Sequence, residues 1–222
     1  MKINKVILFI ALVLTSLAGQ SQSFSGVIKG SVKALKVPAE MQGMESMLTQ
    51  ELSITLKGAK AKTELKNFMG SNTFIYDTLS REYIVMNDMM GQKIAMKKIL
   101  GPEENSQNGF MNFEGTNVSF TKETKSISGY LCKKAIVSQK EEGQEELKME
   151  VWYTDQIQEM DPSSPIPGML MEYLIEVEGM QLQYTTVSVT KGNVSDTEFT
   201  IPEGYTLKTE AEFQQSYPTI GE

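Results

Sequence analysis

The sequence predicts a mainly β protein of the α+β class, built on one long antiparallel sheet that curves. About ten segments alternate apolar and polar side chains with the period of two that is typical of β-strands. Short polar connections join many of them, which indicates hairpins and antiparallel pairing. Because so long a sheet rarely stays flat, we expect it to curl, with one or two helices covering its open apolar face.

The first part of the chain should contain a strand, a short helix and two further strands. Residues 24–32 alternate apolar side chains with serine and lysine. Pro38 then opens a predicted short helix, because its missing N–H costs little in a first turn. Strands are expected over residues 52–57 and 59–66, separated by a kink at Gly58.

The rest of the chain reads as a series of strands. Residues 92–100 fit either a helix or a strand, and residues 101–109 have the composition of a loop. The remaining alternating segments are expected to be strands over residues 73–76, 82–86, 118–123, 129–139, 146–154, 170–178, 181–190 and 197–201.

The N-terminus has the three regions of a cleavable export signal. Lys2 and Lys5 precede an apolar run over residues 6–14, and small residues follow up to Ser21. The run is too short to span a bilayer, which takes about 20 apolar residues, and no later stretch is apolar enough. We therefore expect cleavage near Ser21, a single mature domain over residues 22–222, and an exported protein of the periplasm, the outer envelope or the extracellular space without a transmembrane span.

Composition argues against several classes of function. The formal net charge of −7 and the single arginine, Arg81, disfavour nucleic acid as a partner, since phosphates need a basic face. The chain has no histidine, so it lacks the commonest general base and metal ligand. Its one cysteine, Cys132, cannot form an internal disulfide, and we expect a buried, unreactive thiol. We expect no enzyme activity, no cofactor and no metal site.

Two methionine-rich segments are candidates for a ligand-binding site. Met41, Met44 and Met47 recur every three residues on the predicted helix. Such a stripe fits a helix packed on the sheet, a pliable lid over an apolar ligand, or a copper(I) site, in decreasing order of frequency. The first two interpretations stay open.

The second candidate segment follows a rigid Pro-Ile-Pro-Gly turn. Met169, Met171 and Tyr173 alternate along the strand after it, and Trp152 lies on the preceding strand. Core packing is the commoner meaning of such residues, and the wall of an apolar pocket is the alternative. The candidate ligand-binding residues are therefore Met41, Met44, Met47, Trp152, Met169, Met171 and Tyr173.

Two blocks of sequence resemble a known family. Residues 123–135 read Glu-Thr-Lys-Ser-Ile-Ser-Gly-Tyr-Leu-Cys-Lys-Lys-Ala, and residues 151–157 read Val-Trp-Tyr-Thr-Asp-Gln-Ile before Ile-Pro-Gly-Met-Leu at 166–170. These blocks resemble the exported bacterial domain of unknown function numbered 4412 and, more distantly, the GLPGLI proteins. The resemblance implies a fold like that of the LolA and LolB lipoprotein carriers, a half-barrel with helices on its concave side.

The resemblance and the methionine-rich segments together predict a binding protein or carrier for a lipid or another apolar molecule. A non-catalytic envelope or surface module that contacts a protein partner, with a filled interior, is the alternative. An enzyme that uses carboxylates alone would need two acids converging in a cleft, and no spacing indicates such a pair. The Asp77-Thr78-Leu79 triplet resembles bacterial O-glycan acceptor sites, but an ordinary polar turn is the simpler interpretation.

Overall fold

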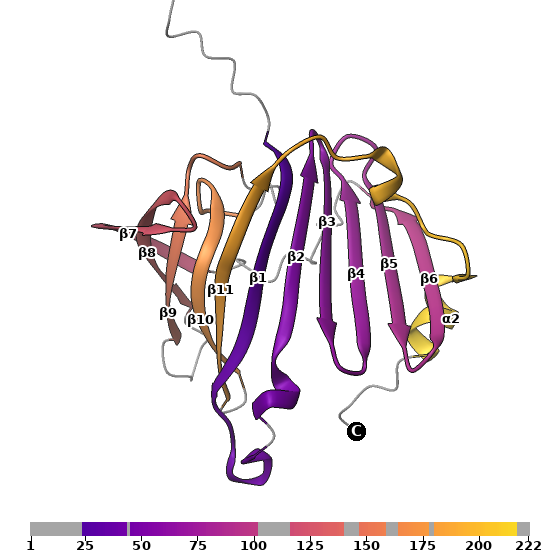
Figure 1. Cartoon of the computed structure of the whole chain (residues 1–222), viewed down its shortest axis with the longest axis horizontal. Coiled ribbons are helices and arrows are strands. Elements are labelled where there is room, and N and C mark those ends of the chain that lie inside the picture. The colour runs from indigo at the N-terminus through magenta and orange to yellow at the C-terminus, as the bar shows by residue number, and fades with distance from the viewer. Residues whose placement is uncertain are drawn as a thin grey trace, which may run out of the picture.

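The computed structural model describes residues 24–43, 45–101, 116–139, 147–158, 164–177 and 180–216. Twelve strands form one sheet in the order β12-β6-β5-β4-β3-β2-β1-β11-β10-β9-β8-β7 (Figure 1). The predicted mainly β, curved antiparallel sheet is confirmed, with one addition: β12 pairs with β6 in parallel. The predicted export signal and part of the predicted loop at 101–109 lie outside the described residues.

The strand bounds agree with most of the predicted segments, and residues 92–100 prove to be a strand. The strands are β1 (Ser25–Lys36), β2 (Gln50–Lys57), β3 (Lys60–Asn67), β4 (Gly70–Asp77), β5 (Glu82–Met89), β6 (Gln92–Ile99), β7 (Thr116–Ile127), β8 (Tyr130–Gln139), β9 (Leu147–Thr154), β10 (Met169–Val177), β11 (Met180–Lys191) and β12 (Thr206–Lys208).

One half of the sheet curls until strands that are not neighbours touch. The Ser128 hydroxyl in the β7–β8 turn donates to the Thr186 carbonyl of β11 at 3.1 Å, although two strands separate β8 from β11. Lys125 Nζ of β7 lies 2.6 Å from Glu172 Oε1 of β10. In Figure 1, β7 and β8 accordingly run steeply across the direction of β1.

The inside of this curl is the face that carries Leu52. Leu52 of β2 packs in one buried cluster with Ala135 of β8 and Val151 of β9, which lie far from β2 in the sheet order. A second buried cluster joins Ile28 of β1 to Met171 of β10. We call the Leu52 side the concave face.

Toward β6, parts of the C-terminal segment pack on both faces of the sheet. Helix α2 (Glu210–Gln215) places Phe213 against Tyr83 and Val85. These two residues lie on the concave face, because the strand register aligns Tyr83 with Leu56 and Val85 with Ile54. A helix on the concave face was expected, and α2 provides one, although from a segment for which none was predicted. The opposite face receives Phe199 of the 3-10 helix η4 (Asp196–Phe199).

Two local predictions were wrong, and a third, the short helix after Pro38, was confirmed only in part. The helix expected after Pro38 is two short 3-10 segments, η2 (Ala39–Met41) and η3 (Glu45–Leu48). The kink at Gly58 is a hairpin turn, in which Gly58 has φ +59°. The strand expected at 197–201 is η4, because the Ser195 hydroxyl accepts from the Thr197 N–H and caps a helical turn.

Helix α2 is a further difference, since no helix was predicted from the sequence at residues 210–215. Its start carries a capping box, in which the Thr209 hydroxyl accepts from the Glu212 N–H and the Glu212 carboxylate accepts from the Thr209 N–H. The spacing of Thr209 and Glu212 is visible in the sequence. It could have identified this helix.

Candidate ligand-binding face

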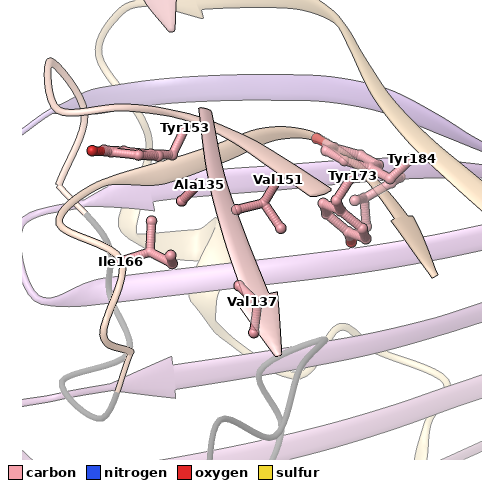
Figure 2. Close-up of a cluster of buried hydrophobic side chains, with 8 residues drawn as sticks. Ala135, Val137, Val151, Tyr153, Ile166, Tyr173 and Tyr184 are labelled. Carbon is pink, nitrogen blue, oxygen red and sulfur yellow. The ribbon is translucent and has the colours of Figure 1, made fainter. Parts of the chain in front are cut away.

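The predicted residues of β10 lie inside the packed core. Met169, Met171 and Tyr173 are 5%, 0% and 5% exposed. Tyr173 and Tyr184 stack with ring centroids 4.8 Å apart, and Figure 2 shows both rings beside Val151. That these β10 side chains line a ligand pocket stays a prediction, because core packing already accounts for their burial.

A close backbone approach positions the start of β10. The Met169 N–H donates to the Ile157 carbonyl at 3.0 Å, just after the Pro-Gly turn. A Cβ atom on Gly168 would lie 2.1 Å from the Thr154 carbonyl oxygen. Only glycine fits this approach without a shift of backbone, which explains why the turn ends in Gly168.

The methionine stripe near the N-terminus is only partly described. Met41 ends η2 and is half-buried, and Met47 belongs to η3, which packs beside β1. Met44 lies outside the described residues. Met41 and Met47 therefore belong to two separate 3-10 segments.

Trp152 sits at the margin of the second core cluster, in a network of charges. Its ring lies under Lys125 Nζ at 4.2 Å and Lys134 Nζ at 5.9 Å. Lys125 is paired with Glu172 at 2.6 Å and Lys134 with Glu150 at 3.0 Å. Trp152 thus helps to hold β7 and β8 on the curl through cation–π contacts.

A close inner contact, between Tyr184 and Gly30, was missed by sequence reasoning. Tyr184 is 1% exposed, and its ring lies where a side chain on Gly30 would be. Its hydroxyl is 3.0 Å from Thr186 Oγ1, and burial raises the pKa of Tyr184 to about 12. The signal in the sequence is a glycine at an inward position of the first strand, where an apolar side chain is expected.

A strip of half-buried apolar side chains crosses the concave face from β1 to β4. We call it the apolar strip, and its members are Val32, Ile54, Ala61, Leu65, Phe74 and Tyr76. Thr63 lies within it, directly between Ile54 and Phe74 in register. At its margin Asn87 Nδ2 donates to Asn72 Oδ1 at 2.7 Å, a polar pair on the same face.

The other face of the same strands is charged. Lys57, Lys60 and Lys62 pair there with the acidic residues Asp196 and Glu198 of η4. The alternation in residues 52–66 contains this division, so sequence reasoning could have found the strip. The candidate site predicted from the sequence lies instead on the two methionine-rich segments.

The structure places Cys132 in the second core cluster, fully buried as predicted. Burial raises the pKa of its thiol, which keeps it protonated and unreactive. We expect thiol-specific labelling of the native protein to be at least about tenfold slower than in denaturant, and Cys132→Ala to cost about 1–2 kcal/mol. Labelling at equal rates in both conditions would contradict the assigned burial.

The described part of the chain shows neither a cluster of metal ligands nor a helix that could span a membrane. It contains no group of three or more Cys, Asp or Glu side chains that could hold a metal ion. None of its helices has the length and apolar character that a bilayer crossing requires.

Comparisons with known proteins identify no family for the chain. No family model and no curated protein matches it. Among solved structures, PNGF-II is similar at 11% identity and a TM-score of 0.49, over 86% of this chain and 32% of the PNGF-II chain, so this chain spans about a third of that protein. LprF from Mycobacterium bovis is similar at 11% identity and a TM-score of 0.36, over 87% of this chain and 96% of that chain. The resemblance to the family numbered 4412 therefore stays an expectation.

Proposed function

We propose that the protein is a non-catalytic binding protein of the cell envelope, which holds a lipid acyl chain or a similar apolar molecule on the concave face of its sheet. The observation that carries this proposal is the division of β2 and β3 into an apolar concave face and a charged opposite face. Apolar side chains that stay half-exposed on an inward-curving surface are typical of sites for apolar ligands. The export signal expected from the sequence supports the envelope location in this proposal.

The ligand would lie along the apolar strip and not inside the curled half. Met171, Tyr173 and Tyr184 already fill that half. Next to the strip, the half-buried amide of Asn72, which accepts from Asn87 Nδ2, is the kind of polar group that orients the polar end of an otherwise apolar ligand.

The filled curl also favours a second candidate function, a module that contacts an envelope protein through its outer surface. Such a module needs no ligand, and its concave face would act only as a core. The two functions differ in whether a charge placed on the strip affects binding of an apolar probe.

A lysine in the middle of the strip tests the proposal. We expect Thr63→Lys to weaken binding of cis-parinaric acid at least about tenfold, because an acyl chain cannot cover an ammonium group without a desolvation cost. Lysine has a long stem and can extend its amine toward solvent, so thermal stability should change little. Fluorescence titration measures the affinity, and thermal unfolding the stability.

Ser53→Lys is the matched control for this experiment. Ser53 is half-buried on β2, and it faces the charged side between Lys29 and Glu64 in register. Its substitution should leave binding unchanged. A wild-type protein that does not raise the emission of cis-parinaric acid, or equal affinities for the wild type and Thr63→Lys, would favour the interaction module instead.

A further inference from the structure

Two neighbouring hairpin turns present large apolar side chains to solvent. The β3–β4 turn is Phe68-Met69 and the β5–β6 turn is Met90-Gly91, and Figure 1 shows both at the same end of the sheet. Phe68, Met69 and Met90 are 65%, 44% and 91% exposed. The Met90 N–H donates to the Met69 carbonyl at 3.2 Å, so the two turns form one tip. We call these three residues the apolar tip.

Met90 is disfavoured at its position in two ways. It has φ +53° and Gly91 has φ +84°, a two-residue turn that prefers Asn or Gly first. A side chain with a Cβ is strained there, and a 91% exposed methionine also places apolar surface in water.

Another turn of the same chain shows that the geometry does not require methionine. The β7–β8 turn, Ser128-Gly129, has φ +48° and +84° and carries a small polar residue at the first position. A position that violates local preference without a packing reason indicates a role for the side chain itself.

Hydrogen bonds hold the turns of the tip in place, and amines flank them. Asn67 Oδ1 accepts from the N–H groups of Met69 and Gly70 at 2.9 and 3.2 Å, which fixes the first turn. Lys66 is exposed at the end of β3, and Lys93 lies on β6 just after the second turn, paired with Asp88 at 3.1 Å.

We propose that the apolar tip inserts into the surface of a lipid bilayer and docks the protein there. The three apolar side chains protrude from turns at one end of the sheet, and lysines flank them. A fluid interface accepts protruding Phe and Met side chains of any arrangement, and the flanking lysines can reach lipid phosphates. This docking is independent of ligand binding on the concave face.

A fluorophore at the tip tests the insertion directly. The full chain with Cys132→Ala and Met90→Cys is labelled with NBD and mixed with phosphatidylcholine vesicles. We expect a blue shift and an increase in emission, as the probe leaves water. The control carries Leu79→Cys, an 86% exposed leucine in the turn that joins β4 to β5, at the opposite end of those strands, and its emission should not change.

The variant Met90→Asn separates docking from folding. Asparagine suits the positive φ, so the melting temperature should hold or rise. Insertion of NBD placed at Met69→Cys should weaken about fivefold or more in this variant, because apolar area at the tip is lost. No response at Met90→Cys, equal responses at the tip and at Leu79→Cys, or unchanged insertion in Met90→Asn would each overturn the proposal. None of these outcomes depends on binding of cis-parinaric acid.

Discussion

Truncating Tyr184 to alanine is expected to lower the free energy of unfolding by about 3–5 kcal/mol, as for other large buried aromatic side chains. Tyr184 is 1% exposed, and its ring contacts Tyr173 in the cluster that joins β2 to β8 and β9. The cavity would open in the inside of the curl, where neighbours held by the sheet cannot collapse into it. Urea unfolding followed by circular dichroism measures the loss.

Tyr184→Phe is the matched control, since it keeps the ring and removes only the hydroxyl that meets Thr186. It should cost about 1 kcal/mol at neutral pH. A loss as large as that of Tyr184→Ala would show that the hydroxyl, and not the packing of the ring, carries the stability.

The stability of Tyr184→Phe should also depend on pH differently from that of the wild type. The pKa of Tyr184 is raised from 10.0 to about 12, so its stabilising contribution is complete below pH 10 and is lost as the pH rises toward 12. Wild type should therefore lose stability more steeply than Tyr184→Phe between pH 10 and 12. Burial also raises the pKa of Tyr83, which leaves part of the alkaline loss in both proteins.

Replacing Gly30 with alanine is expected to destabilise the protein by about 1–3 kcal/mol through overpacking. The new Cβ would lie 2.5 Å from Tyr184 Cε2 and 2.8 Å from the Thr185 carbonyl oxygen. The ring has little freedom to move, because Tyr173 stacks on it. Thermal unfolding should show a lower melting temperature.

Two further variants test whether the cost of Gly30→Ala comes from this contact. Gly192→Ala meets nothing within 4 Å and should change stability by less than about 0.5 kcal/mol. In the Tyr184→Ala background, Gly30→Ala should lose part of its cost, since the contacts with the ring are gone while the 2.8 Å contact with the Thr185 carbonyl oxygen remains. Additive effects in the double variant would show that Gly30 and Tyr184 do not interact.

Most of the strands could be predicted from the sequence alone, because alternation is a local property of the chain. The two faces of β2 and β3 follow from residues 52–66 by the same rule, and so does the apolar strip. The capping box that begins at Thr209 is also local, and it was readable although it was overlooked.

The outcome at β8 shows what the sequence could not settle. Strict alternation places Tyr130, Cys132 and Ile136 on one face, yet Cys132, Ala135 and Val137 are the buried residues. The buried face changes near Lys133, opposite the register shift in β7, where the sheet coils. Such a change depends on the curvature of neighbouring strands and leaves no mark in the alternation.

The sequence by itself determined a mainly β chain with hairpin connections, and it identified Cys132 as a buried thiol. Only the tertiary structure decided which apolar residues are core and which are surface. Met171 is enclosed because the sheet curls over it, whereas Met90 protrudes because two turns end side by side. Hydrophobicity is a property of each residue, but burial depends on contacts between segments far apart in the chain.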